Sequence, residues 1–325
     1  MSGKTVRIRT RRTARAKFRV ALEQLEERAL LAGITGGNLL VARIGDGSTL
    51  LDSSAAPVSV VEYSPTGGSA VQTISFPNTA TERVTDSGTA TSNGYLNFYQ
   101  SFVAVPGYSS TSGTASVAST NAKLGTILGL DGNVSSRTSF PTGGASANPP
   151  SPFAGNNFRS MVATSTNRFY ASGTATGSPD RGGVWYYNGS TFTQISATGS
   201  GSLTNARNVE IYNNQLYVSS ASGSFLGISA VGTGLPTTAN QSATLAINMG
   251  AGAQPYGFVM FDTNNDNVLD RAYVADDRTA VGGGLQKWTF NGTTWSQSWA
   301  LLVNSNGNLS STAGTGFAGL RGLSG

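Results

Sequence analysis

The chain has 325 residues, of which 38% are hydrophobic and only 11% charged, and it contains no cysteine and no histidine. These absences exclude disulfides, zinc sites built from Cys or His, thiol nucleophiles and catalytic triads with an imidazole base. The formal net charge of +5 comes from the N-terminus, because residues 1–33 hold nine Lys/Arg and three Glu, whereas the remainder holds twelve basic and thirteen acidic residues. A nucleic-acid-binding domain needs a basic surface on its folded part, so we expect no nucleic-acid partner.

The composition beyond residue 33 is typical of β-structure and turns. Glycine occupies 42 positions, and after Glu27 the only glutamates are Glu62, Glu82 and Glu210. Helical surfaces depend on Glu, Lys, Gln and Arg, so we expect little helix after residue 33. No run of about 18 apolar residues occurs, and the sequence therefore predicts no transmembrane segment.

The N-terminus combines a basic stretch, residues 1–19, with an amphipathic pattern over Val20–Gly33. Leu22, Leu25 and Ala29 recur at spacings of three and four, which predicts a short helix. Three glutamates interrupt this apolar pattern, whereas a conventional secretory signal has a continuous apolar core. By that rule the segment is not a signal peptide.

A more specific pattern lies at Leu25–Ala32, which reads Leu-Glu-Glu-Arg-Ala-Leu-Leu-Ala after the Arg-rich stretch. It resembles the N-terminal segment of many large exported planctomycete proteins. The resemblance implies that residues 1–33 are an export or processing segment outside the fold, and that the body, 34–325, is extracellular or at the cell surface. The alternatives are a transit-like peptide, or a basic arm that contacts nucleic acid or anionic lipid.

The first half of the body reads as short strands separated by turn residues. Asp46-Gly47, Asn93-Gly94 and Asp131-Gly132 predict tight turns or hairpins, and the Pro- and Gly-rich residues 141–156 predict a long connection between sheets. The predicted strands are Asn38–Ile44, Val58–Tyr63, Val71–Phe76 and Leu96–Val105, the last as one or two strands.

Two similar segments, Trp185–Gln194 and Trp288–Gln297, lie 103 residues apart and each contains Asn-Gly between aromatic and β-branched residues. This pattern predicts a hairpin with a two-residue turn. The register then follows by counting, and it places Trp185 opposite Phe192 and Trp288 opposite Trp295. Such pairs indicate packing and give little evidence of a ligand.

A longer repeat surrounds these hairpins, with units that begin near Arg159, Arg207 and Tyr256, 48 and 49 residues apart. Four-stranded antiparallel units of 40–50 residues are typical of β-propeller blades. Residues 34–325 provide about six such units, and Arg321–Gly325 repeats the start of another. We therefore predict an all-β fold, a β-propeller of six or seven four-stranded blades that is incomplete at the C-terminus. The alternatives are a pair of β-sandwiches and a β-helix.

The one segment that resembles a known site is Asp262–Asp270. Its oxygen donors follow calcium-loop spacing, and the loop resembles the nine-residue calcium loops of integrin-type propellers, with Asn267 in place of the usual glycine. We expect a structural Ca²⁺, and the alternative is a polar hairpin turn. The predicted ligands are Asp262, Asn264, Asp266, the carbonyl of Val268, and Asp270.

Two further groups of charged residues are candidates for chemistry. Asp276 and Asp277 are adjacent in an extended segment, so their side chains point to opposite faces; we expect one of them to accept a hydrogen bond from Arg278 or from the following turn. If the pair lined a channel, acid/base chemistry on a sugar or ester would be open to it.

The second group consists of Arg159, Arg207 and Arg321, which open predicted inner strands, where side chains could border the propeller axis. Together their guanidinium groups would suit a carboxylate or phosphate. The plainer expectation is that each only hydrogen-bonds to a neighbouring loop.

These features predict a monomeric binding or structural module at the cell surface, possessing no catalytic residues and stabilised by calcium. The alternative is a secreted propeller hydrolase or lyase that acts on polysaccharide or ester substrates. Because fold does not imply function, the ligand itself is not predicted.

Overall fold

The computed structural model is all-β. Apart from a 3-10 turn at Val117–Ser119, the residues it describes contain no helix, as the composition predicts, and thus none that is long and apolar enough to cross a membrane. By its contacts the chain divides into Met1–Leu30 and Leu31–Gly325. The predicted N-terminal helix and the export motif lie outside the described residues. These are 33–120, 122–142, 151–176, 182–199, 201–304, 308–312 and 317–323.

The first sheet contains eight strands in the order β1-β2-β4-β6-β7-β8, with β3 paired to β2 and β5 paired to β6. All its pairings are antiparallel. The strands are β1 Leu39–Ile44, β2 Ala55–Tyr63, β3 Gln72–Ser75, β4 Thr85–Ser87, β5 Asn97–Tyr99, β6 Phe102–Tyr108, β7 Lys123–Gly129 and β8 Val134–Ser139.

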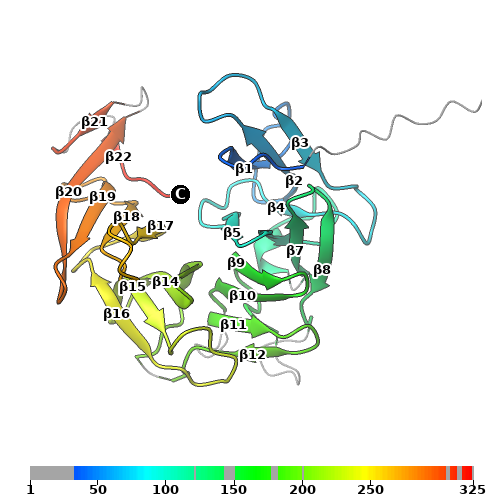
Figure 1. The fold of residues 1–325 in the computed structure, drawn as a ribbon. Helices are drawn as coiled ribbons and strands as arrows, with labels where there is room; N and C mark the ends of the chain where they lie inside the picture. The colour runs from blue at the N-terminus through cyan, green and yellow to red at the C-terminus, as the bar shows by residue number, and fades with distance from the viewer. Residues whose placement is uncertain are drawn as a thin grey trace, which may run out of the picture. The chain divides into compact units, whose positions relative to one another are not determined.

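The other three sheets are antiparallel meanders that follow one another along the chain (Figure 1). The second and third have four strands each, and the fourth adds the short β21 and β22 to four longer strands. The second sheet is β9 Phe158–Ser165, β10 Arg168–Gly173, β11 Gly183–Tyr187 and β12 Phe192–Gln194, and the third is β13 Ala206–Tyr212, β14 Gln215–Ser222, β15 Phe225–Val231 and β16 Ala243–Asn248. The fourth is β17 Pro255–Phe261, β18 Arg271–Asp276, β19 Gly284–Phe290, β20 Trp295–Asn304, β21 Leu309–Ser310 and β22 Phe317–Ala318.

The predicted repeat is present in these three sheets. Their first strands, β9, β13 and β17, start 48 and 49 residues apart. The two tryptophan-bearing hairpins also occupy equivalent places, because β11–β12 and β19–β20 are the third and fourth strands of their sheets. The repeated sequence therefore corresponds to a repeated structural unit.

The predicted register of these hairpins is wrong, because each residue pairs with a partner two positions further along the chain than predicted. Tyr187 pairs with Phe192, and Trp185 pairs with Gln194. In the other hairpin Phe290 pairs with Trp295. Each hairpin does carry one cross-strand aromatic pair, with ring centroids 4.7 Å apart in the first and 5.4 Å apart in the second.

The asparagine of each turn explains the difference. The Oδ1 of Asn188 accepts the backbone N–H groups of Ser190 and Thr191, both at 2.9 Å, and Asn291 does the same for its own turn. Asn188 thus enters the turn as its first residue, and Gly189, with φ of 99°, becomes the first central one. A side chain that replaces a backbone acceptor moves the turn centre along the chain.

In the first half, the four predicted strands are present within a few residues, and Leu96–Val105 forms parts of two strands, β5 and β6. Asp131-Gly132 does connect the paired β7 and β8. The hairpin predicted at Asn93-Gly94 is wrong, because the strands on either side, β4 and β5, both pair with β6 and not with each other.

Consecutive sheets share hydrophobic cores. Ile127 of the first sheet packs in one buried cluster with Phe158 and Phe169 of the second. A second cluster joins residues of β9–β11 to residues of β13–β15, and a third joins β15 and β16 to β17–β19. Each sheet therefore buries its apolar side chains against the next sheet in the chain.

Candidate functional site

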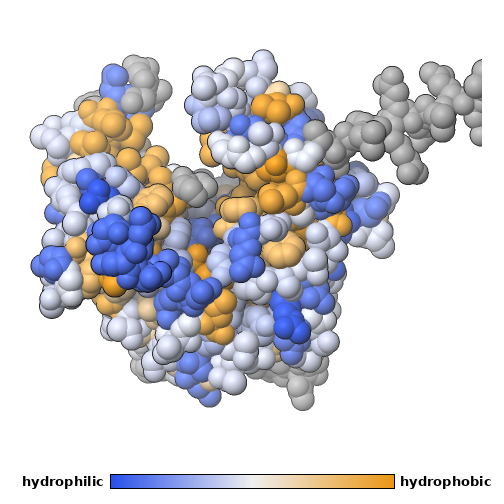
Figure 2. All heavy atoms as spheres, viewed as in Figure 1, coloured by the Kyte–Doolittle hydropathy of each residue, from blue (hydrophilic) through white to orange (hydrophobic). Residues whose placement is uncertain are grey.

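The Asp/Asn-rich loop joins β17 to β18, and nearly all its residues are exposed. In Figure 2 the surface at the place of this loop is hydrophilic. The carboxylate of Asp262 accepts the backbone N–H groups of Asp266 (3.3 Å) and Asn267 (2.8 Å). Asn267 has φ of 66°, the left-handed conformation that replacement of the usual glycine requires of it. The loop is thus curled around its own acidic side chains.

The remaining predicted ligands divide into two groups. Asn264 and Asp266 are hydrogen-bonded to each other at 3.0 Å, and Asp266 also accepts the N–H of Val268. The carboxylate of Asp270 instead accepts the hydroxyl of Thr263 at 2.8 Å. Within the described part of the chain, no group of three acidic residues is placed to hold a metal. Calcium at this loop stays a prediction.

A second group of polar residues lies where β5 of the first sheet meets β9 and β13, the first strands of the second and third sheets. The Nδ2 atom of Asn97 in β5 lies 2.8 Å from Ser160 Oγ of β9, 3.0 Å from Asn208 Oδ1 of β13 and 2.8 Å from the carbonyl of Val209. All of these are buried. Just before β5, Tyr95 forms an isolated parallel bridge with Ser160. Residues from three sheets therefore share one buried hydrogen-bond network.

Beside this network, two arginines each reach from one sheet to the next. Arg159 of β9 donates to the side chain of Asn205 and to the carbonyl of Ala206, at the start of β13. Arg207 of β13 donates to Gln254 Oε1 (2.7 Å) and to the carbonyl of Pro255 (3.0 Å), at the start of β17. Both arginines thus make the hydrogen bonds to a neighbouring loop that the plainer expectation gives them.

The same position in β17 holds Tyr256, whose ring faces two guanidinium groups. The guanidinium of Arg207 lies 3.9 Å from the ring centroid and that of Arg321 lies 5.2 Å from it. The carbonyl of Arg321 accepts the N–H of Gly257, so the C-terminal segment lies beside β17. Arg321 also forms an ion pair with Asp277 at 2.7 Å. We call Arg159, Arg207 and Arg321 the arginine cluster.

Positive charge exceeds negative charge in the arginine cluster. Arg159 and Arg207 are 9% and 8% exposed, and neither forms an ion pair among the described residues. Burial, and next the positive charge of Arg207, lower the pKa of Arg159 to about 10. Burial also lowers the pKa of Arg207, whereas the hydrogen bond to Asp277 raises that of Arg321.

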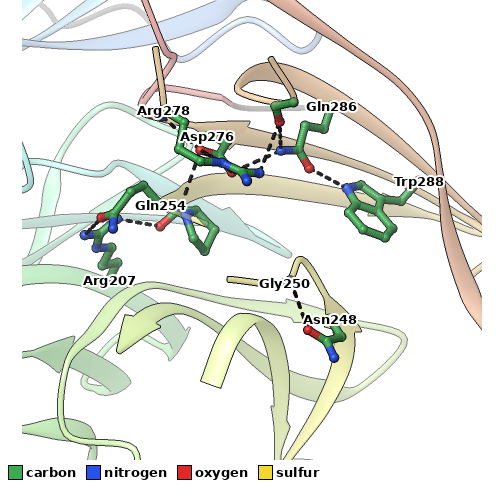
Figure 3. Close-up of polar contacts among 10 residues, drawn as sticks. Arg207, Asn248, Gly250, Gln254, Asp276, Arg278, Gln286 and Trp288 are labelled. Carbon is green, nitrogen blue, oxygen red and sulfur yellow. Dashed lines mark hydrogen bonds and ion pairs between the residues drawn. The ribbon is translucent and has the colours of Figure 1, made fainter. Parts of the chain in front are cut away.

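Asp276 is fully buried and belongs to a charge-paired network that reaches Arg207 through Gln254 (Figure 3). Arg278 donates to both of its carboxylate oxygens, from Nε at 3.0 Å and from Nη2 at 2.8 Å. Gln286 donates to the same carboxylate and accepts a hydrogen bond from the indole of Trp288 at 2.8 Å. Asp276 is thus held by Arg278 as expected, while the adjacent Asp277 binds Arg321. The two aspartates do not face each other as an acid/base pair.

Two carboxyl groups with raised pKa values, Asp86 and Glu210, were not anticipated from the sequence. Asp86 of β4 accepts hydrogen bonds from the N–H of Ser87 and from Asn93, and burial raises its pKa to about 7. Burial raises the pKa of Glu210 in β13 to about 8. Asp86 lies in a polar Thr-Asp-Ser run with no hydrophobic alternation, so nothing in its local sequence indicates burial.

In comparisons with known proteins, the chain matches no family model and no curated protein sequence. The case for function therefore depends on the geometry alone.

Proposed function

We propose that the chain is an exported, propeller-like binding or structural module of the cell surface. The observation that carries the proposal is the junction at Asn97, which joins β5 of the first sheet to β9 and β13, the first strands of the next two sheets, through one buried network. Sheets that pack in chain order, each with one strand at a shared junction, are what propeller blades require. An experimental structure in which these strands do not surround a common axis would refute the propeller arrangement.

Binding is favoured over catalysis by the state of the acidic residues beside this junction. Asp276 is engaged by Arg278 and Asp277 by Arg321. Carboxylates held in ion pairs remain ionised and are poorly suited to donate a proton near neutral pH. Their geometry fits a rigid binding surface.

The proposal is tested with the full-length protein and a panel of neutral and acidic polysaccharides and ester substrates. We expect retention on at least one immobilised polysaccharide with no release of product. Release of reducing ends or alcohol that disappears in Asp86→Asn or Glu210→Gln would favour the hydrolase or lyase instead. Those two acids are the specific observation for that alternative, because pKa values of about 7 and about 8 leave a large protonated fraction at neutral pH, as a general acid needs.

Export is a separate part of the proposal and has its own test. Residues 1–40 fused to a reporter should carry it out of the cytoplasm of a planctomycete host. A matched fusion with Leu30→Asp and Leu31→Asp should stay inside, because it removes the apolar pair of the motif. Equal cytoplasmic retention of both fusions would contradict export.

We also propose a structural Ca²⁺ at the β17–β18 loop. Asp262 and Asp266 each use lone pairs on loop N–H groups, and a carboxylate has further lone pairs for a cation. Calcium added to metal-stripped protein should raise the melting temperature by about 2–4 °C at ten times the Kd. Asp266→Asn should reduce this rise. Asp46→Asn, which changes an exposed aspartate that also accepts loop N–H groups, should not. No heat of binding in calorimetry would exclude calcium.

A further inference from the structure

We propose that the arginine cluster is an anion-binding site, and that it takes a carboxylate or phosphate group of the ligand. The inference rests on the proposed binding function and names the chemistry of what is bound. It is carried by three observations: the convergence of the guanidinium groups, their unmet donors, and the shortage of negative charge around them.

The three guanidinium groups converge although their residues are far apart in sequence. Arg207 and Arg321 face the same Tyr256 ring. Tyr95 lies within electrostatic range of all three arginines, and its hydroxyl lies 3.5 Å from the carbonyl of Arg321.

Donors in this cluster remain unused. The Nε atoms of Arg159 and Arg207 are buried and have no hydrogen-bond partner among the described residues. A buried donor without a partner costs roughly 1–3 kcal/mol, so native proteins seldom retain one without a reason. Two such donors at equivalent positions of neighbouring sheets, β9 and β13, indicate that a group outside the chain completes the site.

The charge balance points to an anion as that group. Asp277 pairs with Arg321, and Asp276 is held by Arg278. Arg159 and Arg207 are therefore left as buried cations without an ion-pair partner among the described residues, and the charge of Arg207 contributes to the lowered pKa of Arg159. A buried charge needs a partner of opposite sign, and planar guanidinium groups match carboxylate and phosphate oxygens best. The Arg321 side chain, 34% exposed, gives the site a side open to solvent.

The test compares melting temperatures of the full-length protein at equal ionic strength in chloride, phosphate, acetate, citrate and galacturonate. We expect phosphate or a carboxylate to raise the melting temperature by about 2–4 °C at ten times its Kd. Phosphate and citrate also stabilise proteins through exclusion from their surface. The decisive quantity is therefore the difference between the wild type and the arginine variants.

The variants are Arg207→Gln and Arg321→Gln, with Arg168→Gln as the control because that arginine is exposed at the start of β10. We expect either cluster variant to weaken anion binding at least tenfold in calorimetry, and the control to leave it unchanged. Arg207→Gln also removes a contact between sheets, whereas Arg321 is partly exposed, so Arg321→Gln keeps the test valid if the former misfolds.

Each outcome decides between the proposals. A rise with phosphate alone, or with carboxylates alone, supports the site and identifies which group it takes. Equal rises in the wild type and both cluster variants, or no rise with any anion, would overturn the anion site. Retention on a neutral polysaccharide would then still support the binding module. If the protein neither responds to anions nor is retained on any polysaccharide, both proposals are refuted.

Discussion

Asp86 and Asp276 are both buried aspartates, 2% and 0% exposed, but they lie in different sheets and have different partners. Asp276 in β18 is bound by the guanidinium of Arg278 and by Gln286. Asp86 in β4 receives hydrogen bonds only from neutral groups, the N–H of Ser87 and the amide of Asn93. A buried aspartate is thus paired with a cation in the fourth sheet, whereas one in the first sheet has only neutral hydrogen-bond partners.

This difference shows that burial alone does not decide the charge of a carboxyl group. Burial disfavours the ionised form, and a nearby cation restores it. Where the chain supplies an arginine two residues away, as at Asp276, the carboxyl group has an ion-pair partner. Where it supplies only amides, as at Asp86, the pKa rises to about 7 and the group titrates near neutral pH.

The largest expected effect is the dependence of stability on pH at Asp86. Its pKa is about 7 in the folded protein and 3.8 when unperturbed. Between these values the folded state holds a proton that the unfolded state has lost, so stability falls as pH rises from about 4 to about 7. The full loss corresponds to about 4 kcal/mol. Urea unfolding at closely spaced pH values measures it.

Asp86→Asn should reduce the slope of this profile, because the amide has no proton to lose, while Glu210, with a pKa raised to about 8, keeps its own part of the slope. Asp52→Asn, at an exposed aspartate, is the matched control and should keep the wild-type slope over the same pH range. Identical slopes in Asp86→Asn and the wild type would show that Asp86 is not the titrating group.

The next effect is the loss of the charge pair in the fourth sheet. Asp276→Asn removes the carboxylate that accepts from Arg278 and Gln286, and it should lower the free energy of unfolding by about 3 kcal/mol. The adjacent substitution Asp277→Asn removes a pair whose side chains are 28% and 34% exposed, and it should cost less than about 1 kcal/mol. Equal costs in chemical unfolding would mean that burial of Asp276 does not matter.

The smallest effect concerns the repeated hairpins. Asn188→Ala and Asn291→Ala each remove one acceptor of two backbone N–H groups. Each should destabilise the protein by about 1 kcal/mol, and Asn188→Asp should restore most of the loss because a carboxylate also accepts. Unequal losses would show that the two turns are not equivalent despite their common sequence.

Much of the repeat could be predicted from the sequence, because hydrophobic alternation and turn residues are local properties. The spacing of the units, the positions of the paired hairpins and the scarcity of helix all agree with the structure. The register of the hairpins could not be predicted from the Asn-Gly pair, since it depends on whether the asparagine enters the turn with its backbone or with its side chain. At Asn93-Gly94 the flanking strands, β4 and β5, both pair with β6 and not with each other. The local sequence does not contain this long-range pairing.

The candidate site shows the same division between local and long-range information. The sequence identified Arg159 and Arg207, because they open two units of the repeat 48 residues apart, and it identified Arg321 because the chain repeats that opening there. The contacts of the Tyr256 ring with Arg207 and Arg321, and the ion pair of Asp277 with Arg321, join residues 44 or more positions apart. The burial of the arginines likewise depends on distant residues. Such contacts form only when separate sheets pack together, because the charge around a residue is set by its neighbours in space.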